Sequence, residues 1–208
     1  MQRSRVFTSV VLAAALAAPA FAAPSLSAPA KPAPQRQEVA LFQAICLGHE
    51  GDVAGAEAEA ARLGLVAAID NRGKTLGEDD VEMLFVPAGG GKLEVMISPA
   101  PDDLVETPGA VVTFCAVRGD DPERELFIAG RALGDQLGLP TPADTDTSRN
   151  YSVYYRKDPG GMTALSSDDD AAIRAAVLAN GFRVFDVRSN KDGVTMLSQM
   201  TGSRGKAQ

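Results

Sequence analysis

Paired apolar runs, each pair separated by a turn sequence, are the feature of this chain that most constrains its fold. Residues 151–156 and 162–165 flank the sequence Asp-Pro-Gly-Gly, and residues 182–187 and 194–200 flank Asn-Lys-Asp-Gly. Asp, Asn, Pro and Gly favour tight reversals, so both pairs are typical of antiparallel hairpins. Because a single helical pattern separates the two hairpins, we expect an α+β fold with an antiparallel or mixed sheet.

Further strands and helices complete the expected order, ααβββαββαββ. The additional strands cover residues 81–86, 93–97 and 110–117, of which the last is apolar enough to be central. The additional helices cover residues 36–47, 53–63 and 122–137. We therefore expect a sheet of about five to seven strands packed by about four helices.

Capping residues predict where the helices begin and end. Asp121 is expected to cap the best-marked helix, and Gly138 follows its last turn. Ser167 is expected to cap the last helix, with Asp170 at the capping-box position. The three carboxylates at 168–170 therefore fit the positive end of a helix better than a metal site.

The first 22 residues have the composition of a secretory signal peptide. Two arginines are followed by an apolar run over residues 6–18 that is too short to span a bilayer. Small residues at the two positions that determine cleavage predict a cut after Ala22. The mature chain is therefore expected to begin at Ala23 and to be periplasmic or secreted, with no membrane span.

The remaining chain divides into three parts by composition. Residues 23–36 are a Pro- and Ala-rich leader that is expected to be disordered. Residues 37–200 are expected to form a single α+β domain. Residues 201–208 are polar and are expected to be a disordered tail.

The mature chain is strongly acidic. The signal peptide holds two of the 20 basic residues and none of the 27 acidic ones, so its removal changes the net charge from −7 to −9. Nucleic acids and anionic membranes attract basic surfaces, so neither is an expected partner. The acidity itself favours solubility, a cationic partner or a divalent ion.

The chain has two cysteines, Cys46 and Cys115, which are expected to form a disulfide. Signal peptides lead to oxidising compartments, where an even number of cysteines is typical of disulfide bonding. The bond would close a loop of about 70 residues and stabilise the fold by about 4 kcal/mol. It would join the first helix to the strand over residues 110–117.

Other roles for the cysteines need more ligands than the chain supplies. Cys46 and His49 have C-x-x-H spacing, and with Cys115 they offer three soft ligands, whereas a structural zinc site takes four. A nucleophile pair of Cys46 and His49 has helical spacing, but its thiolate would oxidise readily outside the cytoplasm. We therefore predict no metal ligands and no cofactor.

Other functional motifs are incomplete. Gly73, Lys74 and Thr75 match the end of a phosphate-binding loop, but its first glycine is replaced by Ala68, and the preceding segment is expected to be helical. Residues 144–148 begin like a calcium loop, yet position six lacks glycine and position twelve lacks glutamate, which leaves only a looser calcium site open. No catalytic residues are predicted.

All three tyrosines lie in the strand expected over residues 151–156. Tyr151 and Tyr155 should share one face of this strand, and Tyr154 and Arg156 the other. One face is expected to pack and the other to be solvated. Because Tyr and Arg favour interfaces, Tyr154 and Arg156 are the predicted recognition surface.

An outline of the chain resembles a known group of proteins. A signal peptide, an Ala-rich helix pair with the pattern Phe42-x-x-x-Cys46, and a strand with Phe114-Cys115-x-Val117 are similar to small exported proteins of proteobacteria that have no assigned activity. The resemblance covers residues 36–120. It implies export and a cysteine pair, and it transfers no catalytic residue.

These features favour an exported, non-catalytic domain that binds a small ligand or a cell-envelope protein. The alternative is a periplasmic hydrolase whose carboxylates come together only in the fold, because 27 acidic residues leave many pairs that folding could assemble. A third hypothesis is a metal-binding or redox protein that uses Cys46, His49 and Cys115. A pocket with two nearby carboxylates would favour the hydrolase.

Overall fold

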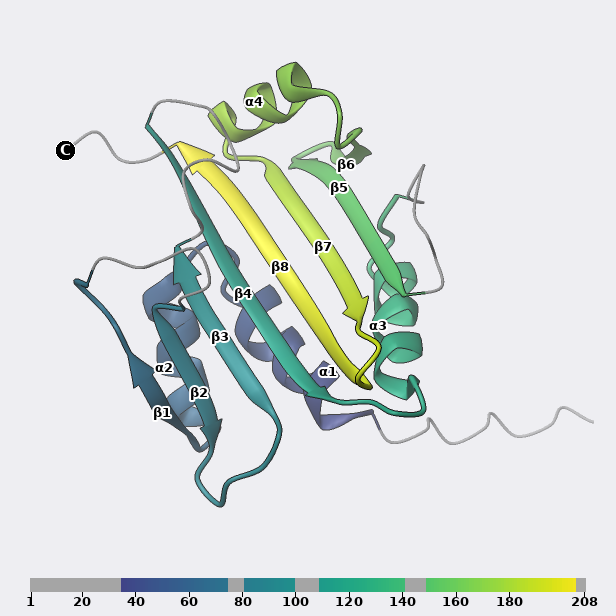
Figure 1. The fold of residues 1–208 in the computed structure, drawn as a ribbon. Coiled ribbons are helices and arrows are strands. Elements are labelled where there is room, and N and C mark those ends of the chain that lie inside the picture. The colour runs from purple at the N-terminus through teal and green to yellow at the C-terminus, as the bar shows by residue number, and fades with distance from the viewer. Residues whose placement is uncertain (1–34, 75–80, 100–108, 141–148, 205–208) are drawn as a thin grey trace, which may run out of the picture. The chain divides into compact units, whose positions relative to one another are not determined.

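The longest strands, β4 (Ala110–Asp120) and β8 (Val194–Arg204), pair antiparallel along their whole length at the centre of the sheet (Figure 1). They belong to a computed structural model of the chain, which describes residues 35–74, 81–99, 109–140 and 149–204. The sequence prediction that the strand over 110–117 is central is confirmed. The predicted signal peptide, most of the leader, the calcium-like segment and residues 205–208 lie outside the described residues.

Over the described residues, the sheet has eight strands in the order β1-β2-β3-β4-β8-β7-β5-β6, and every neighbouring pair is antiparallel. The remaining strands are β1 (Leu65–Asp70), β2 (Met83–Pro87), β3 (Glu94–Pro99), β5 (Asn150–Asp158), β6 (Gly161–Ala164) and β7 (Phe182–Ser189). The predicted α+β class is confirmed. The predicted strand number was too low and the predicted element order was wrong.

The missing strand is β1, which the sequence analysis expected to be helical. It lies at one edge of the sheet, and only Leu65 is buried, so it lacks the alternation that identifies a half-buried strand. Its pairing with β2 also shifts register between Ala67 and Ile69. The strand does not restore the phosphate-loop motif, because Ala68 still replaces its first glycine.

The helices cover the two faces of the sheet unequally. Helices α1 (Gln37–Leu41), α2 (Val53–Arg62) and α3 (Glu125–Gln136) lie behind the sheet in the view of Figure 1, and α1 continues as the π-helical segment η1 (Phe42–Leu47). Helix α4 (Asp170–Leu178) packs at one end of the opposite face. None of the described helices is long and apolar enough to cross a membrane.

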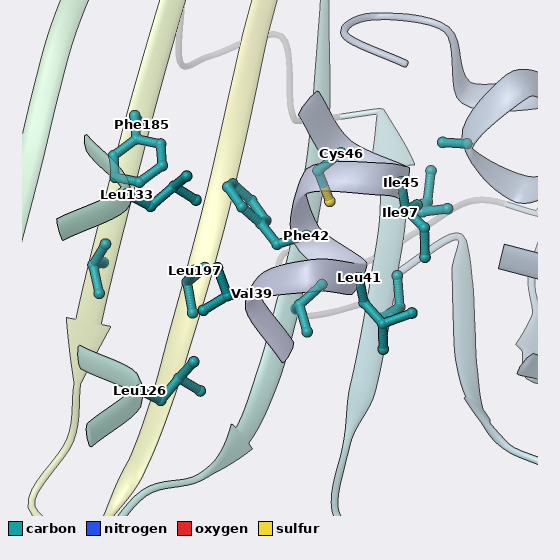
Figure 2. Close-up of a cluster of buried hydrophobic side chains, with 14 of the residues drawn as sticks. Val39, Leu41, Phe42, Ile45, Cys46, Ile97, Leu126, Leu133, Phe185 and Leu197 are labelled. Atoms are coloured by element: carbon teal, nitrogen blue, oxygen red, sulfur yellow. The ribbon is translucent and has the colours of Figure 1, made fainter. Parts of the chain in front are cut away.

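The main core lies between α1, η1, α2 and α3 and the sheet. Figure 2 shows Phe42 pointing from η1 toward Leu197 and Phe185 of the central strands, and the two phenyl rings meet edge to face at 5.8 Å. At Gly130, a Cβ atom would come within 3.0 Å of Val187, so glycine lets α3 approach the sheet closely. A smaller core under α4 contains Ile173, Ala176 and Val177 together with Val112, Phe182 and Val184.

Cys46 and Cys115 form the expected disulfide, with their Cα atoms 5.4 Å apart. The bond joins η1 to β4 and closes the long loop between the first helix and the sheet. Glu50 makes a second connection nearby, because its carboxylate binds Lys157 at 3.0 Å and Arg183 at 3.1 Å. The turn after η1 is thereby held to β5 and β7.

Two predicted caps differ from the structure in position. Asp121 lies four residues before α3, yet its buried carboxylate accepts hydrogen bonds from the N–H groups of Leu126 at 2.8 Å and Phe127 at 2.9 Å. Asp121 therefore caps the start of α3 although it is not the residue directly before the helix. Its carboxylate also accepts a hydrogen bond from the Thr195 hydroxyl at 2.7 Å. At α4, the cap is Asp169 and not Ser167.

The folded region is longer than the sequence predicted at both ends. Strand β8 continues through Arg204, and Thr201 is buried in it, so residues 201–204 belong to the sheet and not to a tail. At the other end, Arg36 was assigned to the leader. Its guanidinium binds Asp121 at 3.3 Å and Glu38 at 3.0 Å, which fixes the start of α1 to the end of β4.

Replacing Asp121 with Ala is expected to lower the free energy of unfolding by about 3 kcal/mol, because two helix N–H groups and the Thr195 hydroxyl lose their buried partner. Urea unfolding followed by circular dichroism measures the change. Glu123, which is exposed beside it, provides the control, and Glu123→Ala should change stability by less than about 0.5 kcal/mol. Equal effects of the two substitutions would show that Asp121 has no special structural role.

Candidate functional site

Among the described helices, only α4 lies on the second face of the sheet, where it covers one end, and we call this face the open face (Figure 1). Side chains alternate between the two faces of a strand, so the strand register determines which residues share a row across the open face. The last row that crosses five strands before the β7–β8 turn contains Glu94, Arg118, Met196, Arg188 and Asn150. We call it the charged row.

The next row toward α4 is largely buried, and most of its side chains are small. It contains Met96, Ala116, Ser198, Asp186 and Ser152, again one residue from each strand. Beyond it, the open face becomes apolar and packs under α4. The open face therefore changes from apolar to charged along the strands, with a buried carboxylate between the two regions.

A groove of about 840 Å³ lies over the charged row, at the end of the sheet far from α4. Its walls also include residues from the ends of the strands and their turns, namely Gly91, Lys92, Asp120, Arg149, Ser189, Asn190 and Val194. Ligand sites in proteins have volumes of roughly 300–1,000 Å³, so the groove is large enough for a small molecule.

Basic side chains outnumber acidic ones in this groove, although the whole chain has a net charge of −7. Of the described residues that line it, Lys92, Arg118, Arg149 and Arg188 are basic, and only Glu94 and Asp120 are acidic. Lys92 forms an ion pair with Asp120, and Arg118 forms one with Glu94. Within the described part of the chain, Arg149 has no ion-pair partner.

Arg188 forms an ion pair with Asp186 of the neighbouring row. The Nε atom of Arg188 lies 2.5 Å from a carboxylate oxygen of Asp186, which is only 4% exposed. The Ser152 hydroxyl donates to the same carboxylate. Burial raises the pKa of Asp186, and the hydrogen bonds and the Arg188 charge only partly oppose this effect.

The predicted recognition surface, Tyr154 and Arg156, does not join the groove. Tyr154 is half-buried and packs beside Phe182 at the α4 end of the open face, with ring centroids 6.4 Å apart. Arg156 is exposed and binds Asp158 of its own strand at 3.1 Å. The expected alternation is present, because Tyr151 and Tyr155 are buried in the main core. A recognition role for Tyr154 and Arg156 stays a prediction.

The disulfide also bears on the alternative roles of the cysteines. Both sulfur atoms are bonded to each other, so neither Cys46 nor Cys115 is available as a thiolate ligand or nucleophile in this state. His49 lies in the turn after η1, on the helix-covered side of the sheet, and does not line the groove over the charged row.

Sequence reasoning missed the groove because its residues lie far apart in the chain. Arg118 and Arg188 belong to β4 and β7, which are neighbours of the same strand, β8, but are separated in sequence by α3, the β5–β6 hairpin and α4. A usable signal existed within each strand. Both arginines directly follow a buried valine, so both could be assigned to the face opposite the core.

No protein-family model, no curated protein and no solved structure matches this chain.

Replacing Asp186 with Asn is expected to change how stability depends on pH. Because burial raises the pKa of Asp186 in the folded state, its stabilising contribution is greatest below the ordinary aspartate pKa of about 4 and is lost as pH rises through the folded value. The stability of Asp186→Asn relative to the natural protein should therefore increase from pH 4 toward neutral pH.

Urea unfolding at several pH values measures this difference. The exposed Asp192 of the β7–β8 turn provides the control. The stability of Asp192→Asn relative to the natural protein should change little with pH. If the stability of Asp186→Asn relative to the natural protein decreased as the pH rose, the prediction would be contradicted.

Proposed function

We propose that this protein is an exported, non-catalytic domain that binds a small ligand in the groove over the charged row. The observation that carries the proposal is the groove itself, whose volume of about 840 Å³ lies within the range of known ligand sites. Its floor comes from Arg118, Met196 and Arg188 on three adjacent strands. Side chains on paired strands are positioned more rigidly than side chains on loops, which favours specific binding.

Export is part of the same proposal. Residues 1–22 have the pattern of a signal peptide with cleavage after Ala22, and the chain resembles small exported proteins of proteobacteria. The pairing of Cys46 with Cys115 supports a periplasmic or secreted location, because disulfides persist in oxidising compartments. Neither nucleic acid nor a membrane surface is proposed as a partner of this acidic chain.

A cell-envelope protein as the partner, and the alternative hydrolase, fit the groove less well. A cell-envelope protein would be expected to contact a broad surface, whereas the groove is concave and of small-molecule size. A hydrolase would use Glu94 and Asp120, the acidic residues among the described lining. Each of these carboxylates is bound to a cation that also lines the groove, and a carboxylate held in this way is poorly placed to donate a proton or attack a substrate.

Native mass spectrometry of the mature protein, purified from its own cells, tests the binding proposal. We expect a small-molecule adduct on the natural protein. Met196→Trp, which places an indole in the groove floor, should abolish that adduct. Met162→Trp on the exposed face of β6 serves as the control and should retain it.

Two outcomes would contradict the proposal. One is an adduct that survives equally in both tryptophan variants, because the ligand would then bind elsewhere. The other is the absence of any adduct from the natural protein together with turnover of a chromogenic ester or glycoside that Glu94→Gln abolishes, which would favour the hydrolase.

A further inference from the structure

The chemistry of the groove also indicates what kind of ligand it takes, and this inference rests on the binding function proposed above. The groove has a surplus of basic side chains within an acidic protein. What matters for a ligand is which of these cations still has unused hydrogen-bond donors, because a fully occupied ion pair attracts an anion only weakly.

Arg188 retains most of its donors. A guanidinium has five N–H groups, and the Arg188 ion pair with Asp186 is made through Nε. No ion pair or side-chain hydrogen bond with a described residue engages its two terminal nitrogens. The two terminal nitrogens of a guanidinium can bind two oxygens of one carboxylate or phosphate group through a pair of parallel hydrogen bonds. The side chain of Arg188 is 58% exposed, so a ligand in the groove can reach it.

Arg149 directly precedes β5, the strand that pairs with β7, which contains Arg188. The backbone N–H of Ser189, the next residue after Arg188, donates to the Arg149 carbonyl at 2.8 Å, which fixes the relative position of the two backbones. Both residues line the groove, and Arg149 has no ion-pair partner within the described residues. Two basic residues whose donors are not fully used by the described residues therefore line the same end of the groove.

The groove also has an apolar floor next to these cations. Met196 lies directly opposite Arg188 in the β7–β8 register, and Val194 precedes it on the same strand and face. Methionine is flexible and polarizable, and it adapts to apolar groups of different shape. Arg188 and this apolar floor are adjacent, so one small molecule can contact both.

We propose that the ligand is an organic oxyanion, whose carboxylate or phosphate group is bound by Arg188 and Arg149 and whose apolar body lies on Met196. The recognition is by charge and by paired hydrogen bonds at one end, and by apolar contact at the other. Lys92 and Arg118 are paired with Asp120 and Glu94, so these two pairs add little net charge to the groove.

NMR titration of the full mature protein tests this assignment with phenyl phosphate and benzoate as acidic probes and benzamide as a neutral probe of similar shape. We expect both acids to shift the backbone amide signals of residues 149, 188 and 196. Benzamide should bind at least about tenfold more weakly, since a charge-assisted hydrogen bond contributes roughly 1.5–3 kcal/mol. A response to only one acid would identify which oxyanion the groove prefers and would support the assignment.

Matched variants identify the side chains that bind the acid. Arg149→Gln and Arg188→Gln should each weaken acid binding by about tenfold. Arg174→Gln, on the exposed side of α4, should leave acid binding unchanged. Because Arg188→Gln leaves the buried Asp186 without its cation, Arg149→Gln decides the result if the Arg188 variant does not fold.

Three results would overturn the assignment. Equal binding of acidic and neutral probes would show a groove without selectivity for anions, and the proposed small-molecule function would still stand. Acid binding that Arg149→Gln leaves unchanged would exclude this pair of cations. No response to any probe would also overturn the oxyanion assignment, whereas the adduct measurement with Met196→Trp decides the proposed function independently.

Discussion

The pairing of β4 with β8 is the constraint on which the rest of the structure depends. Eleven residues of each strand pair in unbroken register, so every side chain of the sheet's centre is assigned to one face or the other. Val117 and Leu197 enter the main core, and Arg118 and Met196 face the groove. A slip of one residue would reverse these assignments and place Arg118 against α1 and η1. The disulfide from η1 to β4 strengthens the same arrangement.

Unequal coverage of the two sheet faces gives the protein a place for a site. Three helices and η1 bury one face completely enough to form the main core, whereas α4 covers only one end of the other. Asp121 and Arg36 fix α1 and α3 to the strand ends, so the helix layer is held without using the open face. The charged row is then free to line a groove on a rigid floor.

Much of the fold could be predicted from the sequence, because local patterns specified it. Turn residues identified the two hairpins, and alternation placed Tyr151 and Tyr155 together on one face of their strand. Edge strand β1 could not be predicted, since its exposed residues lack alternation, and the strand order depends on non-local pairing. The candidate site was missed for the same reason. Arg118 and Arg188 meet only through β8, while Tyr154, chosen for its residue type, packs under α4.

A crystal structure of the mature protein grown with phenyl phosphate would test the central claim most directly. We expect the phosphate oxygens within hydrogen-bond distance of the terminal nitrogens of Arg188 and the side chain of Arg149, and the phenyl ring on Met196. Phenyl phosphate bound at another surface, with the groove over the charged row occupied only by solvent, would contradict the claim that the open face is a binding site for organic anions.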